Sequence, residues 1–134
     1  MIFIDTGAFF ASKVKNDVNY PSAVKIERQI KAGKYGKMIT TNYILDEFFT
    51  LLRARVSYEE TIQIGETIRR SPNIRIIWIL EALEETSWEF FKEHRDKTYS
   101  FTDCTSFVVM RSLGMNLAFS YDSHFEQAGF QIIG

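Results

Sequence analysis

The sequence has little cysteine, proline or glycine, and each shortage excludes a class of protein. A single Cys, at position 104, excludes a disulfide scaffold and a four-thiolate zinc site. Seven Gly and two Pro in 134 residues exclude collagen-like and linker-rich chains. We expect Cys104 to be a small buried hydrophobic residue in a reducing compartment.

Long hydrophobic runs are also missing. No uninterrupted apolar run exceeds six residues, whereas a helix that spans a bilayer needs about 20. No basic segment precedes the first acidic residue, Asp5, so the N-terminus does not resemble a signal peptide. We therefore expect a cytoplasmic protein without a membrane partner.

Charge of one sign does not dominate the chain. The formal net charge is −1, which gives no strong overall attraction to nucleic acid or anionic lipid. Lys25, Arg28, Lys31 and Lys34 recur every three residues, so they share roughly one face of a predicted helix. Such a stripe is usually a solvated face, and the alternative is a surface that holds phosphates.

The pattern of apolar residues predicts an α/β protein. Length and a 46% apolar composition are typical of one globular domain, here residues 1–134. Strands are predicted at 2–4, 38–41, 74–79, 116–120 and 131–133, and helices at 21–34, 42–55, 57–70, 81–94 and 100–113, the last capped by Ser100 or Thr102. Strands that alternate with helices predict a three-layer α/β/α domain with a mostly parallel central sheet flanked by helices.

Four acidic residues lie at or near the ends of predicted strands. Asp5 ends the first strand, and Asp122 follows the fourth by two residues. Glu47 lies near the start of the helix after the second strand, and Asp103 begins the helix before the fourth. Sites in open parallel sheets form beyond the carboxyl ends of the strands, so we expect these carboxylates to gather there.

Glu47 and Asp103 each have a local context that bears on this expectation. The helical row of Glu47 is otherwise apolar (Ile44, Leu51 and Ala54), which predicts a half-buried carboxylate. Asp103 alone could be a structural acid, favoured by the dipole of the helix that it begins. The apolar helix behind it directs its carboxylate toward the sheet edge.

Clustered carboxylates predict a hard divalent cation. Without one, their mutual repulsion raises at least one pKa. Mg²⁺ and Mn²⁺ prefer carboxylate and water oxygens, and a site of this kind suits hydrolysis of phosphodiesters. His94 and His124 are isolated in the sequence, and each is interpreted as a core-edge or surface residue rather than a ligand.

Four segments together resemble the PIN-domain nucleases, in particular the short VapC-like toxins. They are Ile2–Thr6, Thr40–Glu47, Ser100–Cys104 and Phe119–Phe125, the last followed by Gly129 and Phe130. The resemblance covers nearly the whole chain. It is carried by the order and spacing of the four segments, since each is weak alone.

The resemblance implies a Mg²⁺- or Mn²⁺-dependent ribonuclease. It assigns catalysis and metal binding to Asp5, Glu47, Asp103 and Asp122, with Thr6 and Ser120 as supporting hydroxyls that orient a carboxylate or a water. Water is expected to attack phosphorus in line and the ribose 3′-oxygen to leave. The implied partners are RNA, a second copy of the chain in a homodimer, and an antitoxin segment that lies across the acidic pocket.

The contacts to RNA are predicted from charge alone. Lys13, Lys15, Lys25 and Arg28 are the candidates for holding the flanking phosphates. The abundant aromatic residues, of which 12 are Phe, are expected to lie mostly in the core. An exposed subset of them would suit a dimer or antitoxin surface.

Four alternatives stay open at this stage. The fold could serve a non-catalytic module that binds protein or RNA, or an RNA-processing nuclease that has no antitoxin. Asp5-Thr6-Gly7-Ala8 also resembles the active-site turn of retroviral-type aspartic proteases, although those are nearly all-β. A receiver or phosphatase with Asp5 as phospho-acceptor is a further alternative. This chain lacks the additional acidic residues that those families need beside the phospho-acceptor.

Overall fold

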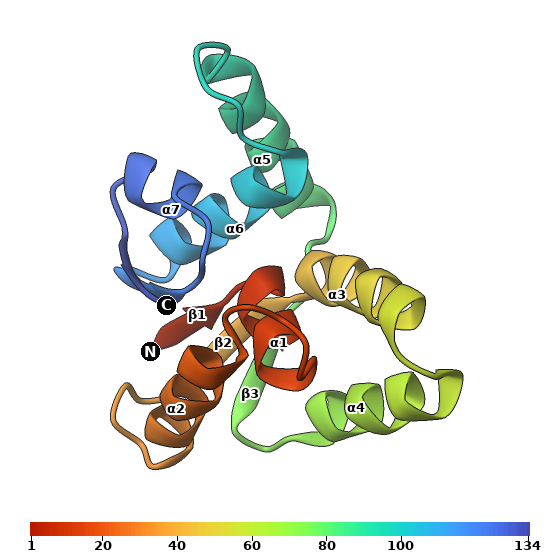
Figure 1. Cartoon of the computed structure of the whole chain (residues 1–134). Coiled ribbons are helices and arrows are strands. Elements are labelled where there is room, and N and C mark those ends of the chain that lie inside the picture. Colours follow the sequence, from red (N-terminus) through yellow and green to blue (C-terminus); the bar gives the residue numbers. More distant parts are fainter.

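A parallel sheet of five strands runs through the middle of the molecule in a computed structural model that describes residues 1–134 (Figure 1). The strands are β1 (Ile2–Ile4), β2 (Met38–Thr41), β3 (Ile74–Ile77), β4 (Leu117–Phe119) and β5 (Gln131–Ile133). Their spatial order is β3-β2-β1-β4-β5, and every neighbouring pair is parallel.

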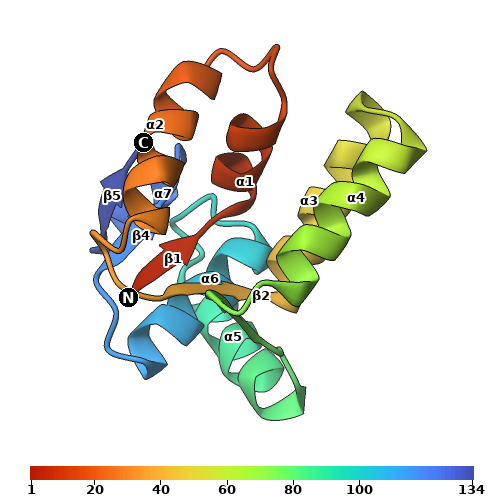
Figure 2. The ribbon, with the colours of Figure 1, turned by 90° about the horizontal axis from the view of Figure 1, so that it is seen from below.

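Seven helices surround this sheet. They are α1 (Thr6–Lys13), α2 (Tyr20–Lys31), α3 (Asn42–Arg55), α4 (Tyr58–Arg70), α5 (Glu81–Glu93), α6 (Phe101–Ser112) and α7 (His124–Gln127). Helices α1 and α2 lie on one side of β1, and α5 and α6 lie on the other (Figures 1 and 2). The predicted three-layer α/β/α fold with a parallel sheet is confirmed.

The central strand is buried on both faces because its side chains alternate in direction. Ile4 lines a cavity with Phe9 of α1 and Ile30 of α2. Phe3 points the other way, with its ring centroid 6.1 Å from that of Phe125 in α7. All three residues of β1 are buried, as their uninterrupted apolar run indicates.

The direction of the chain's path across the sheet reverses between β1 and β4. From β1 the chain proceeds through β2 to β3, and it then returns to the opposite side for β4 and β5. Ligand sites in open α/β sheets form at such a reversal, outside the carboxyl ends of the strands. Here those ends are Asp5 after β1 and Ser120 after β4.

Side-chain caps set the starts of three helices. Thr41 and Ser57 accept hydrogen bonds from the backbone N–H groups of Ile44 and Glu60, each three residues on. At α6, Ser100 and Asp103 form a complete capping box. Helix α6 ends where Gly114 takes a φ of +66°, a conformation that glycine adopts without strain.

Two helices and one strand differ from the prediction. Helix α1 is not among the predicted helices, because Asp5 is assigned only to the end of a strand, whereas it also occupies the N-cap of α1. The single-turn α7 is not predicted either. The strand predicted over 74–79 ends at Ile77, and β3 is only partly buried because it lies at the sheet edge.

Three smaller expectations concern α2, Cys104 and membrane spans. Helix α2 ends at Lys31, so Lys34 lies beyond it and does not share its face. Cys104 is fully buried, and burial together with the Asp103 charge raises the pKa of its thiol to about 11. None of the helices combines the length and apolarity that a bilayer span requires.

Candidate active site

The four predicted acidic residues line one pocket at the carboxyl ends of β1 and β4. The pocket has a volume of about 330 Å³. Its lining residues are Asp5, Thr6, Gly7, Phe10, Glu47, Leu51, Asp103, Tyr121 and Asp122. No Lys or Arg is among them, so the carboxylates have no cationic side chain in the pocket.

Asp5 is the most buried of the four acids, with 7% of its surface exposed. Burial raises the pKa of its carboxyl to about 7; hydrogen bonds from Ser120 and Thr6 oppose the rise, and the charges of Asp103 and Asp122 add to it. The Ser120 hydroxyl donates to Asp5 Oδ2 at 2.9 Å and accepts the Asp122 N–H at 3.0 Å. Ser120 therefore links two of the acids.

Asp103 combines a structural role with a place in the pocket. Its backbone N–H donates to Ser100 Oγ at 3.0 Å, and its Oδ2 accepts the Ser100 N–H at 3.0 Å. Only Oδ2 is used in the capping box. The capping interaction thus fixes the side chain and leaves Oδ1 without a protein donor, so the helix cap and the acidic site share one residue.

Asp122 lies in the turn between β4 and α7. Its Oδ1 accepts the backbone N–H of His124 at 2.9 Å, a local bond that holds the carboxylate on its own turn. Its side chain is 39% exposed, against 13% for Asp103. The two carboxylates therefore enter the site from separate elements and with different access to solvent.

The expectation that Glu47 is half-buried is wrong. The residue is exposed, although it lines the same pocket as the three aspartates. Of the apolar residues in its helical row only Ile44 is buried, because Leu51 faces the open pocket and Ala54 is exposed. The core face of α3 is instead formed by Leu45, Phe48 and Leu52.

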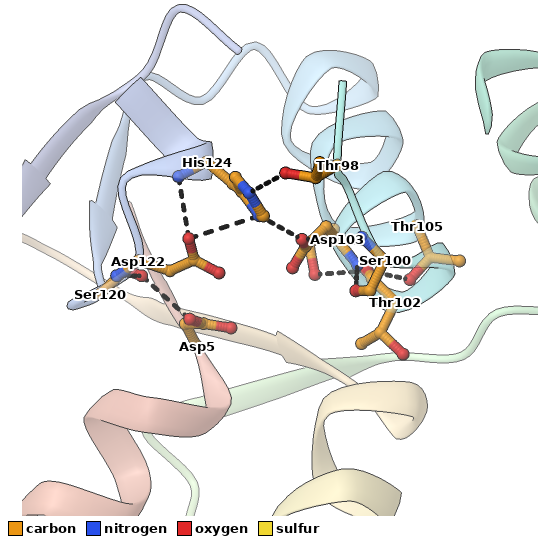
Figure 3. A network of polar contacts seen from close by, with 10 residues as sticks. Asp5, Thr98, Ser100, Thr102, Asp103, Thr105, Ser120, Asp122 and His124 are labelled. Atoms are coloured by element: carbon orange, nitrogen blue, oxygen red, sulfur yellow. Dashed lines mark hydrogen bonds and ion pairs between the residues drawn. The ribbon is translucent and has the colours of Figure 1, made fainter. Parts of the chain in front are cut away.

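His124 belongs to the acidic cluster, although its isolation in the sequence predicts only a core-edge or surface residue. Its Nδ1 lies 2.9 Å from Asp103 Oδ2 and 3.4 Å from Asp122 Oδ1, and its Nε2 lies 3.0 Å from Thr98 Oγ1 (Figure 3). The available signal was its position two residues after Asp122. In a short turn that spacing brings a side chain back toward the same site.

The donor set fits a hard divalent cation. A carboxylate oxygen of Asp103 and one of Asp122 lie within 4.8 Å of each other, and a ring nitrogen of His124 lies within the same distance of both. The hydroxyl of Thr6 is buried and has no hydrogen-bond partner, and buried Asp5 has no cationic neighbour in the pocket. Carboxylate oxygens and an unused hydroxyl are the ligands that such ions prefer.

The predicted basic contacts do not line this pocket. Lys13 pairs with Glu27 at 2.9 Å beside a different cavity, between α1, α2 and α4. Lys15, Lys25 and Arg28 are exposed. Any contact of these residues with RNA would therefore involve nucleotides away from the acidic pocket.

The aspartic-protease alternative is wrong. Asp5 and Thr6 lie at the start of a helix in a parallel α/β fold, whereas that alternative requires a nearly all-β protein.

Comparison with known proteins gives consistent matches. The sequence profile of the PIN domain matches residues 2–131. The 23S rRNA-specific endonuclease VapC20 of Mycobacterium tuberculosis is 35% identical over 130 residues, which are 97% of this chain and 95% of that protein. The VapC ribonuclease of Archaeoglobus fulgidus is 36% identical over 123 residues, or 91% and 77% of the two chains.

Solved structures agree with this result. The crystal structure of VapC20, described as a sarcin-ricin loop cleaving toxin, has a TM-score of 0.86 at 34% identity and covers 97% of this chain and 96% of that one. VapBC2 of Rickettsia felis has a TM-score of 0.71 at 11% identity, covering 99% and 98%, which shows a shared fold.

Proposed function

The chain belongs to the PIN-domain family, and from this membership we propose that it is a ribonuclease that depends on Mg²⁺ or Mn²⁺ and hydrolyses RNA phosphodiester bonds. The observation that carries the proposal is the pocket itself. It unites Asp5, Glu47, Asp103 and Asp122 without any cationic side chain. Four carboxylates in such a pocket repel one another unless a cation is bound.

The aspartates would hold the cation. Asp5 is fixed by Ser120, and Asp103 and Asp122 each have one carboxylate oxygen that accepts no protein hydrogen bond. A divalent cation held by these residues would supply charge neutralisation for the phosphoryl group and the leaving oxygen and would lower the pKa of the attacking water. Thr6 lines the same pocket, and its buried hydroxyl has no hydrogen-bond partner in the protein.

Glu47 has a different environment from the aspartates, and we assign it a different role. Its carboxylate enters from α3, is exposed, and accepts no hydrogen bond from the protein. It is therefore free to accept a proton from a water molecule that attacks phosphorus. The bond between phosphorus and the ribose 3′-oxygen breaks, which leaves a 5′-phosphate on the product.

The substrate that we propose is a structured segment of ribosomal RNA. VapC20 is named as a 23S rRNA-specific endonuclease, and it matches this chain over nearly its full length. Lys13, Lys15, Lys25 and Arg28 would hold flanking phosphates at nucleotides away from the acidic pocket, since none of these residues lines it. Since Lys13 already pairs with Glu27, its contribution is expected to be smaller than that of Lys25 or Arg28.

We further propose that the chain is the toxin of a toxin–antitoxin pair. No Lys or Arg side chain lines the acidic pocket, which is open at the protein surface. An antitoxin segment with Arg or Lys would complement its charge, and it would exclude RNA and metal together.

The proposed homodimer is supported by aromatic side chains outside the core. Trp88 and Phe91 of α5 are 46% and 38% exposed. Both pack on Phe101 of α6, with ring centroids 6.1 and 5.8 Å from it. Exposed clusters of this kind are typical of protein interfaces, and Trp88→Glu is expected to shift a dimer toward monomer in sedimentation.

Cleavage of an RNA oligonucleotide with the sequence of the sarcin-ricin loop tests the proposed function. The wild type is expected to cut it with Mg²⁺ or Mn²⁺ and to stop in EDTA, while Asp103→Asn remains inactive. Binding of Mn²⁺ without cleavage of that RNA or of total ribosomal RNA would favour the non-catalytic module instead.

A further inference from the structure

One histidine connects the acids of two separate elements. His124 is the first residue of α7, and its Nδ1 approaches Asp103 Oδ2 on α6 at 2.9 Å and Asp122 Oδ1 on its own turn at 3.4 Å. Figure 3 shows the ring between the two carboxylates, with Asp5 across the site. No other side chain contacts both carboxylates with a polar atom.

The hydrogen bonds divide each of these carboxylates into a used and a free oxygen. Oδ2 of Asp103 accepts bonds from the Ser100 N–H and from the His124 ring, and Oδ1 accepts none. Oδ1 of Asp122 accepts the His124 N–H and faces the same ring nitrogen, and Oδ2 accepts none. His124 therefore contacts only oxygens that the protein already uses.

The neighbours of the ring define its tautomer. An ionised carboxylate oxygen only accepts hydrogen bonds, so the ring nitrogen that faces two of them, Nδ1, carries a hydrogen. In the neutral ring Nε2 is then an acceptor, and the Thr98 hydroxyl, 3.0 Å away, donates to it. Both ring nitrogens are engaged, so neither has a lone pair directed at the pocket.

We propose that His124 is a positioning residue for the metal-binding carboxylates, and that Thr98 fixes its tautomer. This inference rests on the proposed function, because it assigns the remaining oxygens, Oδ1 of Asp103 and Oδ2 of Asp122, to the cation. His124 contacts neither the cation nor the RNA. It acts by holding two mutually repelling carboxylates at one separation and in one orientation.

The physical need for such a residue follows from where the two acids come from. Asp103 is fixed by a helix cap, whereas Asp122 is carried on a turn with a 39% exposed side chain. Without the ring, Asp122 would keep only the hydrogen bond from the His124 backbone N–H, and no donor would bridge its repulsion from Asp103. Loss of groups that orient metal ligands typically reduces metal affinity by about 10- to 100-fold.

Calorimetric titration with Mn²⁺ alone tests the inference without any RNA. His124→Phe keeps a planar ring and removes both nitrogens, and we expect it to weaken Mn²⁺ binding by about 10- to 100-fold. His124→Asn retains a side-chain N–H near the position of Nδ1, and we expect it to recover most of the affinity. Unchanged affinity in a folded His124→Phe protein overturns the inference.

Thr98 gives a second variant that does not disturb the core. Thr98 is exposed, so Thr98→Val is expected to fold normally and to cause a smaller loss of Mn²⁺ affinity, which Thr98→Ser restores. Thr86→Val is the matched control, because the Thr86 hydroxyl only donates to the Ala82 carbonyl within α5. An equal effect of Thr86→Val and Thr98→Val contradicts the assigned role of Thr98.

Two spectroscopic measurements separate positioning from direct ligation. ¹⁵N NMR of the metal-free protein is expected to show His124 with the hydrogen on Nδ1, and a hydrogen on Nε2 alone overturns the inference. Pulsed EPR of the Mn²⁺ complex is expected to show no coupling to a directly bound histidine nitrogen. Such a coupling would make His124 a ligand and overturn its positioning role.

The outcomes distinguish this inference from the proposed function. If the wild type binds no Mn²⁺, the proposed function fails and the inference fails with it. If the wild type and His124→Phe bind Mn²⁺ equally and both cleave RNA, only the inference fails.

Discussion

The Ser120 hydroxyl donates a 2.9 Å hydrogen bond to Oδ2 of Asp5 across a sequence separation of 115 residues. The bond joins the residues that follow β1 and β4, the two strands between which the chain reverses direction in the sheet. It stabilises the ionised form of a carboxyl whose pKa burial raises to about 7. Ionisation of Asp5 near neutral pH therefore destabilises the metal-free folded protein.

The stability of the metal-free protein should fall as pH rises through the acidic range. Asp5 binds a proton up to about pH 7 when folded but only up to 3.8 when unfolded. The folded state is therefore favoured by this group at low pH, and the advantage is lost as pH approaches 7. At about 1.36 kcal/mol per pKa unit, the loss in unfolding free energy is on the order of 4 kcal/mol.

Urea unfolding in EDTA at several pH values measures this effect. In Asp5→Asn that part of the pH dependence should disappear, and at pH 7 the variant should be at least as stable as the wild type. Asp96→Asn is the matched control, since Asp96 is exposed and lies outside the pocket. Identical pH profiles of Asp5→Asn and wild type would show that Asp5 is not titrating abnormally.

Removal of the Ser120 hydroxyl should raise the pKa of Asp5 further, because that hydroxyl lowers it in the wild type. Ser120→Ala is expected to cost about 1–3 kcal/mol of stability at pH 8, where Asp5 is ionised and would lose its buried donor. The cost should be smaller at pH 5. Ser112→Ala, which removes a hydroxyl bound to the Val109 carbonyl at the end of α6, should show no such pH dependence.

The two roles of Asp103 should be separable by mutation. Ser100→Ala removes the N-cap of α6 and is expected to cost about 1 kcal/mol, with most of the Mn²⁺ affinity kept. Asp103→Asn keeps an oxygen that can accept the Ser100 N–H, so its stability should change less while Mn²⁺ affinity falls sharply. Thermal unfolding and Mn²⁺ titration of both variants measure the two effects. An equal loss of Mn²⁺ affinity in Ser100→Ala and Asp103→Asn would show that the two roles are not separable.

Glu47→Gln should affect activity without affecting stability. Because Glu47 is exposed, we expect the unfolding free energy of the variant to differ from that of the wild type by less than about 0.5 kcal/mol. Cleavage of RNA should fall by at least about 100-fold if Glu47 accepts a proton during the reaction. The neighbouring exposed Asp46 provides the control, since Asp46→Asn should change neither quantity. Wild-type cleavage by Glu47→Gln would remove Glu47 from the mechanism.

The sequence was sufficient to predict the fold class and the residues that meet in the pocket. Strand ends bring Asp5 and Asp122 together in any parallel sheet of this order, and the second strand directly precedes the helix that carries Glu47. The exposure of Glu47 could not be predicted, because Leu51 in its row lines an open pocket rather than the core. Helical periodicity identifies a shared face but does not say what covers it.

His124 shows a second limit of sequence reasoning. The spacing from Asp122 is the one signal that the sequence offers for this histidine, and its other neighbours, Thr98 and Asp103, lie 26 and 21 residues away. Their proximity depends on how α7 is placed against α6, which is fixed by packing between Phe107 and Phe125, whose ring centroids are 5.0 Å apart. Local residue types do not determine that placement.

Thermal unfolding of wild type and Asp5→Asn, each in EDTA and in millimolar Mn²⁺, tests the central claim most directly. Binding at 100 times the dissociation constant stabilises a folded protein by about 2.7 kcal/mol. We predict that Mn²⁺ raises the Tm of the wild type and leaves that of Asp5→Asn unchanged. An equal shift in both proteins, or no shift in either, would contradict a metal site built on these acids.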